Sequence, residues 1–339
     1  MPKRVTIAEV AALAGVHKGT VSRALSGATE GQVNEATVRR VQEAAATLGY
    51  VPNIVARGLR TSLSMTIGVI IPDLTNPIFP PMVRGIENYL APRGYTALVA
   101  NSDGQKQLER ASFDSLLARR VDGFILGTGH TDDPLLADAA ERDVKVVLIN
   151  RGTAGDLGFP LVTGDDAAGI TEAVNHLADL GHRRVLHLAG PRDFTTSIVR
   201  SDAFAESAGL RGLEHATDWL PALSVEAGQA AMDRVLDGGA SSWTAVVAAN
   251  DLVALGTMRS LRAHGLDCPR DMSVVGFNDM PFAADFSPPL TTVHVPHLEM
   301  GAECARLLLD GISAGRQESG TTSLPVSLMV RGSTAAPRG

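Results

Sequence analysis

Residues 5–27 read VTIAEVAALAGVHKGTVSRALSG and predict two short helices joined by a tight turn. Thr6 followed by Glu9 is a capping box, in which the hydroxyl caps a backbone N–H and the glutamate reaches back. Gly15 is expected to end the first helix, because glycine tolerates the left-handed backbone that follows a helix. A second helix follows from about His17 to Leu25. Two helices joined so closely form a helix-turn-helix.

A third helix is predicted from Glu35 to Leu48, with Asn34 as its N-cap and Gly49 just after its end. Its apolar residues recur at helical spacing, so it should pack against the first two helices. Three small packed helices also occur in modules that bind other proteins. The spacing alone therefore leaves two kinds of partner open.

The second helix of a helix-turn-helix enters the major groove of DNA, where its N-terminal residues meet base edges. The expected base-reading residues are His17, Lys18, Gly19 and Arg23. An arginine can donate two hydrogen bonds to guanine, and Thr20 and Ser22 can reach phosphates. His17 is a poor N-cap, so this helix is expected to fray at its start.

Charge is distributed unevenly along the 339 residues. Residues 1–60 contain eight Lys and Arg against four Glu, although the whole chain has a net charge of −7. A basic segment before an acidic remainder favours a segment that meets a polyanion. An ordinary solvated helical face would carry the same charges, so the charge supports the DNA interpretation without deciding it.

The segment Pro52 to Arg60 predicts a short helix between two larger parts of the chain. Pro52 prevents the third helix from continuing, and Asn53 can cap a new one. Gly58 costs such a helix about 1 kcal/mol relative to alanine, and isolated helices this short are unstable in water. A plain linker is the alternative.

The remainder of the chain alternates between apolar runs of strand length and amphipathic stretches of helical length. Seven runs stand out: 65–71, 96–100, 123–126, 144–149, 184–189, 244–249 and 272–277. This alternation predicts doubly wound α/β architecture with parallel sheets. Seven strands exceed one typical sheet and a second set begins near Val162, so two subdomains with a ligand site between them are expected.

Several other classes of protein are excluded or disfavoured by the sequence. No apolar run reaches 18 residues, and the N-terminus has no uninterrupted apolar core of a signal peptide. Two cysteines cannot build a disulfide framework, and His294, His297 and Glu299 fit no strong metal motif. Nucleotide-binding and hydrolase motifs are missing, so no catalysis, cofactor or metal is expected.

The stretch 5–27 resembles the head of the lac repressor/galactose repressor family of bacterial regulators, which typically reads TI.DVA..AGVS..TVSRVLN. The match continues through TVRRVQEAAATLGYVPNIVARGL, which is similar to the family's third helix and hinge helix. The resemblance implies that Leu59 is the hinge leucine that wedges into the minor groove. Thr6, Asn53 and Arg57 complete the expected DNA interface.

The resemblance extends through the body, in PDLTNPIF, AANDLVALG, MSVVGFND and the closing LPVSLMVRGST. It implies an effector site between two subdomains like those of periplasmic sugar-binding proteins. The residues implied for effector binding are Phe79, Arg200, Trp219, Asn250 and Asn278. Asn278 stands where the family usually has aspartate, which favours a neutral polyol over a cationic ligand. Core packing is the alternative for Trp219.

The expected organisation has four parts. They are a helix-turn-helix head (1–49), a hinge helix and linker (50–62), an N-subdomain (63–163 plus 294–323) and a C-subdomain (164–293 plus 324–339). The expected function is a cytoplasmic, sequence-specific repressor that binds palindromic operator DNA as a homodimer and responds to a sugar or sugar-like effector. The chain end, VRGSTAAPRG, lacks tetramerising heptads. The alternative is a cytoplasmic sugar-binding or sugar-processing α/β protein with an accessory head.

Overall fold

The computed structural model describes residues 5–25, 33–50, 63–155, 157–238 and 242–338. It divides into two compact units, Met1–Ser64 and Met65–Gly339, which we call the head and the body. The predicted hinge residues Asn53, Arg57 and Leu59 lie outside the described residues.

The head contains the three predicted helices, α1 (Ile7–Ala14), α2 (Lys18–Leu25) and α3 (Glu35–Leu48). The backbone N–H and the hydroxyl of Thr6 both donate to Glu9 Oε2, at 2.7 and 2.9 Å. Gly15 takes the left-handed conformation at the end of α1, with φ +66°. Asn34 Oδ1 accepts the Thr37 N–H at 2.8 Å and begins α3. The capping residues therefore set these helix ends as the sequence predicts.

The three helices of the head share one small core. Val10 of α1, Val21 of α2 and Val41 of α3 are each fully buried. Alanines 11, 14, 24, 44 and 45 complete the core. Small side chains at these positions let three short helices pack closely.

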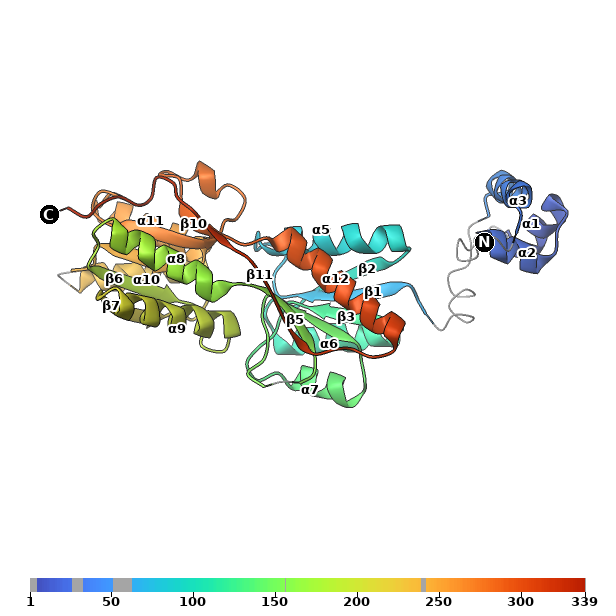
Figure 1. Ribbon diagram of the computed structural model, residues 1–339, viewed down its shortest axis with the longest axis horizontal. Helices are drawn as coiled ribbons and strands as arrows, with labels where there is room; N and C mark the ends of the chain where they lie inside the picture. Colours follow the sequence, from blue (N-terminus) through green and yellow to red (C-terminus); the bar gives the residue numbers. More distant parts are fainter. Residues whose placement is uncertain (1–4, 26–32, 51–62, 156, 239–241, 339) are drawn as a thin grey trace. The chain divides into compact units, whose positions relative to one another are not determined.

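The body contains two six-stranded sheets (Figure 1). The first has the order β11-β5-β4-β3-β1-β2, from β1 (Thr66–Ile71), β2 (Thr96–Asn101), β3 (Gly123–Leu126), β4 (Val146–Ile149), β5 (Pro160–Gly164) and β11 (Gly320–Leu324). The second has the order β12-β10-β9-β8-β6-β7, from β6 (Arg184–Ala189), β7 (Glu214–Trp219), β8 (Ala245–Ala248), β9 (Ser273–Asn278), β10 (Thr291–His294) and β12 (Ser327–Met329). The β10–β12 pair is antiparallel, and the other strand pairs of the described residues are parallel.

Helices cover both faces of each sheet (Figure 1). The helices on the first sheet are α5 (Phe79–Leu90) and α12 (His297–Ala314) on one face, and α6 (Lys106–Ala118) and α7 (Pro134–Glu141) on the other. The second sheet packs between the pair α8 (Asp166–Asp179) and α9 (Thr195–Leu210) and the pair α10 (Val225–Asp237) and α11 (Asp251–Ala263). The predicted doubly wound fold class is therefore confirmed.

The chain crosses between the two sheets three times, after β5, after β10 and after β11. The Asp165 N–H donates to the Leu324 carbonyl at 2.9 Å, which ties the first crossing to the third. Strand order reverses beside β1 in one sheet and beside β6 in the other, and ligands of such sheets bind beyond the carboxyl ends of the strands at this point. No described helix meets the length and apolarity needed to cross a membrane.

All seven predicted strands are confirmed within two residues at each end. The runs missed five strands, β5, β7, β10, β11 and β12, whose sequences are PLVTG, EHATDW, TTVH, GTTSL and SLM. Of these, β7, β11 and β12 lie at sheet edges, where side chains remain partly exposed. An edge strand needs no continuous apolar run, so this signal could not find these three. The interior strands β5 and β10 were missed because PLVTG and TTVH are short and contain threonine among their apolar residues.

Candidate functional site

The recognition helix α2 turns a polar, basic face away from the core of the head. Lys18 and Arg23 are exposed, and Thr20 and Ser22 are partly exposed, whereas Val21 is buried against α1 and α3. Lysine and arginine on one exposed helix face are the groups that meet phosphates and guanine edges. The structure thus brings the expected base-reading and phosphate-binding side chains onto one helix.

The prediction that His17 would cap this helix poorly is wrong. Its Nδ1 accepts the Gly19 N–H at 3.1 Å, and its carbonyl accepts the N–H groups of Thr20 and Val21 at 2.8 and 3.2 Å. An imidazole nitrogen that accepts a hydrogen bond does the work of the usual serine hydroxyl. Gly19 leaves room for the ring, because a Cβ there would lie 3.3 Å from Nδ1. The ring stays exposed at the start of the helix.

Arg200 of α9 is the most strongly bound of the expected effector residues. Its Nη2 forms an ion pair with Asp166 Oδ1 at 2.9 Å, and its Nη1 donates to the Ala249 carbonyl at 2.7 Å. The guanidinium carbon lies 3.7 Å from the centre of the Phe277 ring. Arg200 and Asp166 are both buried, and burial raises the pKa of Asp166, which the positive charge of Arg200 opposes.

Arg200 lies close to two of the other expected residues. Asn250 follows Ala249 and caps α11 by accepting the Val253 N–H at 2.8 Å, and Asn278 follows Phe277 at the end of β9. Trp219 ends β7 and is partly exposed, with the Arg192 guanidinium 4.3 Å from its ring centre. Phe79 begins α5 in the first subdomain and is fully buried in its core.

Strained backbone marks the carboxyl ends of strands in both sheets. Asn278 has φ +110° and Asn150, just after β4, has φ +70°. Residues other than glycine rarely adopt these angles, and such strain clusters at ligand sites. Both asparagines are buried.

The two subdomains meet through the segments that follow β3, β4 and β6. The Thr131 N–H donates to the Asp193 carbonyl at 2.9 Å, and the Gly152 N–H donates to Thr195 Oγ1 at 3.0 Å. His130 Nδ1 and Asp193 Oδ2 lie 2.9 Å apart. We call these three segments, with the start of α9, the junction.

Arg151 lies at the junction and was not among the expected effector residues. It follows β4, is buried, and places its guanidinium carbon 3.6 Å from the centre of the Phe194 ring, which belongs to the other subdomain. Burial lowers the pKa of Arg151 to about 10, and the positive charge of Arg200 adds to this effect. Its place directly after a buried strand is the sequence signal that marks it as a candidate, although the family resemblance did not include it.

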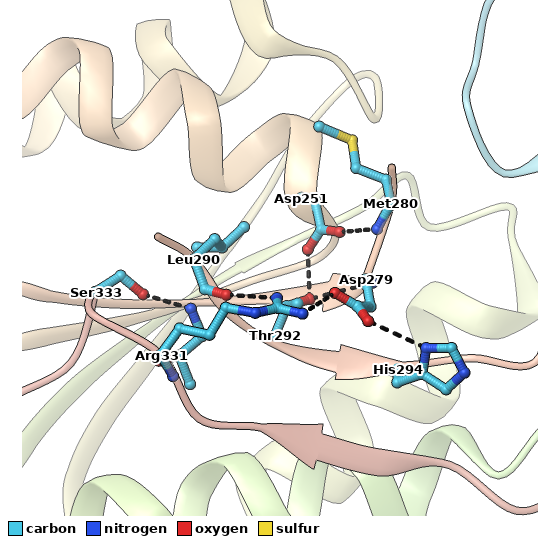
Figure 2. A network of polar contacts seen from close by, with 9 residues as sticks. Asp251, Asp279, Met280, Leu290, Thr292, His294, Arg331 and Ser333 are labelled. Carbon is cyan, nitrogen blue, oxygen red and sulfur yellow. Dashed lines mark hydrogen bonds and ion pairs between the residues drawn. The ribbon is translucent and has the colours of Figure 1, made fainter. Parts of the chain in front are cut away.

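A second polar network surrounds Asp251, the residue after Asn250 (Figure 2). One carboxylate oxygen accepts the Met280 N–H at 2.7 Å, and the other accepts the Thr292 hydroxyl. Asp279 lies beside this pair and binds Arg331 Nη2 at 2.7 Å and His294 Nδ1 at 3.1 Å. The network joins β9, β10, the start of α11 and the C-terminal segment.

Substitution of Asp251 should change how stability depends on pH. Burial raises the pKa of Asp251 to about 7, which its hydrogen bonds to Thr292 and Met280 oppose. An acid with a raised folded pKa stabilises the fold at low pH, and this contribution is lost as pH rises from about 4 to 7. Asp251→Asn cannot ionise, so it should lose less unfolding free energy than the wild type between pH 5 and 8, by about 2–4 kcal/mol.

Urea unfolding at pH 5 and pH 8 measures this difference. Asp271→Asn is the control, because hydrogen bonding to the Asp267 backbone lowers the pKa of Asp271. Its carboxylate is therefore ionised throughout this range, and the control should keep the wild-type slope. If wild type and Asp251→Asn lost the same unfolding free energy between pH 5 and pH 8, the raised pKa of Asp251 would be wrong.

His294 and His297, which the sequence analysis weighed as metal ligands, contact other groups in the structure. His294 binds Asp279, and His297 is buried at the start of α12. Burial lowers the pKa of His297 to about 3, and the charge of Arg200 adds to this. Within the described ranges, no group of three or more His, Cys, Asp or Glu is placed to hold a metal ion.

Two family models match the chain, one for each unit. Residues 6–53 match the model of bacterial regulatory proteins of the lacI family, and residues 174–334 match a periplasmic binding protein-like domain. The chain is 32% identical over 334 residues to the HTH-type transcriptional repressor CytR of Escherichia coli strain K12, covering 98% of this chain and 96% of CytR. It is 36% identical to the HTH-type transcriptional regulator CelR of Thermobifida fusca, covering 97% and 98%.

Solved structures agree with the sequence comparison. The lac repressor dimer bound to operator and the anti-inducer ONPF superposes with a TM-score of 0.86, 29% identity and coverage of 98% of this chain and all of that chain. The complex of CelR with cellobiose superposes with a TM-score of 0.73 and 34% identity, covering 97% and 100%.

A helix-turn-helix head joined to a body of two parallel-sheet subdomains defines the class of ligand-responsive DNA-binding regulators. The chain belongs to the lacI family of bacterial regulatory proteins.

Proposed function

We propose that this protein is a transcriptional repressor whose affinity for operator DNA is controlled by a small effector bound between the two body subdomains. The observation that carries the proposal is the pairing of an exposed basic recognition helix with a body that buries polar groups at the carboxyl ends of its strands. DNA binding accounts for Lys18 and Arg23, and effector binding accounts for Arg200, Asn250 and Asn278. A role in the cytoplasm without catalysis follows from this proposal.

The proposed effector is a sugar or a sugar-like molecule. A relative with 34% identity was solved with cellobiose, and the fold places Trp219 and Arg200 in the same subdomain as Asn250. We propose that Phe79 contributes from the first subdomain and that the boundaries 63–163 plus 294–323 and 164–293 plus 324–339 separate the moving parts. An effector shifts operator affinity only by the difference between its affinities for the two arrangements.

A homodimer on a palindromic operator is the proposed assembly. Apolar side chains that a second copy could cover lie exposed on β2 and α6, at Leu98, Val99 and Leu108. Light scattering at micromolar concentration should give twice the chain mass. A stable monomer or tetramer would contradict this assembly.

Recognition by α2 predicts a specific loss of operator affinity. Lys18→Ala and Arg23→Ala should each weaken binding by about 1–3 kcal/mol at one symmetric base position in each half-site. Fluorescence anisotropy with the DNA upstream of the protein's own gene measures the effect. Arg39→Ala is the control, because Arg39 is exposed on α3 and pairs with Glu35 at 3.6 Å.

The same assay tests the function as a whole. The wild type should shift the upstream DNA, and a metabolite found by a thermal-shift screen of sugars, sugar acids and nucleosides should release it. A protein that binds a sugar and no DNA would instead be a sugar-binding protein with an accessory head.

A further inference from the structure

The ring of His17 takes part in the backbone hydrogen bonding at the start of the recognition helix α2. Its Nδ1 accepts the Gly19 N–H at 3.1 Å, while the His17 carbonyl accepts the N–H groups of Thr20 and Val21. A ring nitrogen that accepts a hydrogen bond carries no proton, so the proton of the neutral imidazole is on Nε2. The ring therefore has one donor left, the Nε2–H, and no remaining acceptor.

The same ring occupies the space beside Gly19. A Cβ built on Gly19 would lie 3.3 Å from Nδ1 and 3.9 Å from Cε1 of His17. A side chain at residue 19 would therefore compete with the imidazole for one place on the helix surface. Because Gly19 has no side chain, the imidazole lies where that side chain would begin.

The remaining donor of His17 is free to meet DNA. His17 is exposed, and its Nε2 makes no hydrogen bond among the described residues of the head. The N-terminal residues of a recognition helix lie against base edges in the major groove. Guanine and adenine both present the acceptor N7 there, whereas cytosine presents an N–H donor and thymine presents its O4 beside a methyl group. A single N–H donor at this place therefore favours a purine and disfavours cytosine.

We propose that His17 determines operator specificity by donating its Nε2–H to N7 of a purine in each half-site, and that Gly19 is the positioning residue that makes room for the ring. This inference rests on the proposed function, because it names a group on the DNA that the recognition helix reads. The contact fixes a purine without distinguishing guanine from adenine, since N7 is common to both. Residue 19 thus contributes to base reading through the side chain it lacks.

Selection of binding sites from random double-stranded DNA tests the proposal with the full-length protein. The wild type should select a purine at one symmetric position in each half-site. His17→Ser and Gly19→Ala should both lose the preference at this same position and keep it at the others. Serine is a good N-cap and alanine favours a helix, so α2 should stay folded in both variants, which far-UV circular dichroism checks.

A base analogue then tests the acceptor itself. In 7-deazaguanine and 7-deazaadenine a C–H group replaces N7, while base pairing is kept. Placed at the selected purine, the analogue should weaken wild-type binding about 2- to 10-fold, the range expected for one neutral hydrogen bond, and should leave the affinity of His17→Ser unchanged. Arg39→Ala, on the exposed face of α3, is the control and should lose affinity for the analogue as the wild type does. Fluorescence anisotropy measures these affinities.

The outcomes separate this inference from the proposed function. If His17→Ser weakened binding equally for all sequences, His17 would contact a phosphate and the base contact would be wrong. If His17→Ser kept the purine preference, or if the wild type bound the 7-deaza site as tightly as the natural site, the base contact would also be wrong and the repressor function would stand. If only Gly19→Ala kept the preference, the positioning role of Gly19 would be wrong. If the wild type selected no sequence, the repressor function would fail, and the base contact with it.

Discussion

Replacing Gly301 by alanine is expected to destabilise the body by about 3 kcal/mol or more, at the upper end of the cost of overpacking. A Cβ on Gly301 of α12 would lie 2.0 Å from the carbonyl oxygen of Met82 in α5. The contact is reciprocal, because a Cβ on Gly85 of α5 would lie 1.9 Å from the Leu298 carbonyl oxygen of α12. Backbone atoms of two packed helices cannot turn aside as a flexible side chain can, so the helices must separate.

Gly209→Ala is the matched control for this substitution. Gly209 lies inside the helix α9, and a Cβ there would have no atom within 4 Å. Alanine should therefore raise stability by about 0.5–1 kcal/mol through its helix propensity. Urea unfolding followed by far-UV circular dichroism measures both changes. Equal midpoints for the two variants would show that α5 and α12 do not pack backbone to backbone.

Arg200→Ala is expected to cost about 3–5 kcal/mol of folding stability, because it leaves Asp166 buried without its ion-pair partner. Without Arg200 the pKa of Asp166 should rise further, since burial already raises it and the lost positive charge opposed that rise. An acid whose pKa is raised in the folded state stabilises the fold at pH values below its unfolded pKa, and this contribution is lost as pH rises. The defect should therefore be larger at pH 8 than at pH 5.

The double variant Arg200→Ala with Asp166→Asn should recover most of this stability, because asparagine removes the stranded charge. Neither variant should respond to an effector, and both should bind operator as the wild type does, since the head is a separate unit. Unfolding midpoints at the two pH values and operator titrations give the three readouts. If the Arg200→Ala variant kept the wild-type response to the effector, Arg200 would not belong to the effector site.

Short-range signals were enough to predict the head. The contacts of Thr6 with Glu9 and of Asn34 with Thr37 span three residues each, and such local contacts are readable from spacing. Six of the eight interior strands of the body were equally readable, because burial on both faces favours continuous apolar runs. His17 shows the limit of this approach, since its capping role depends on the room that Gly19 leaves.

The candidate site was predicted only in part, because its contacts join distant segments. The family resemblance implied a role for Arg200 in the effector site, but its partner Asp166 lies on another helix, and no spacing in the sequence pairs the two. Arg151 meets Phe194 across the junction, 43 residues apart in the chain. No spacing pattern in the sequence could reveal that Arg151 would be buried against this ring.

The three crossings between the sheets also have a consequence for synthesis on the ribosome. The head is complete once residue 50 has emerged, but the first sheet needs β11 and the second needs β12, both beyond residue 319. At about 5–20 residues per second, roughly 15–50 seconds pass between these events. A nascent chain should therefore carry a folded head while its body still lacks both C-terminal strands, and chaperones that bind exposed apolar strands would meet the body during this interval.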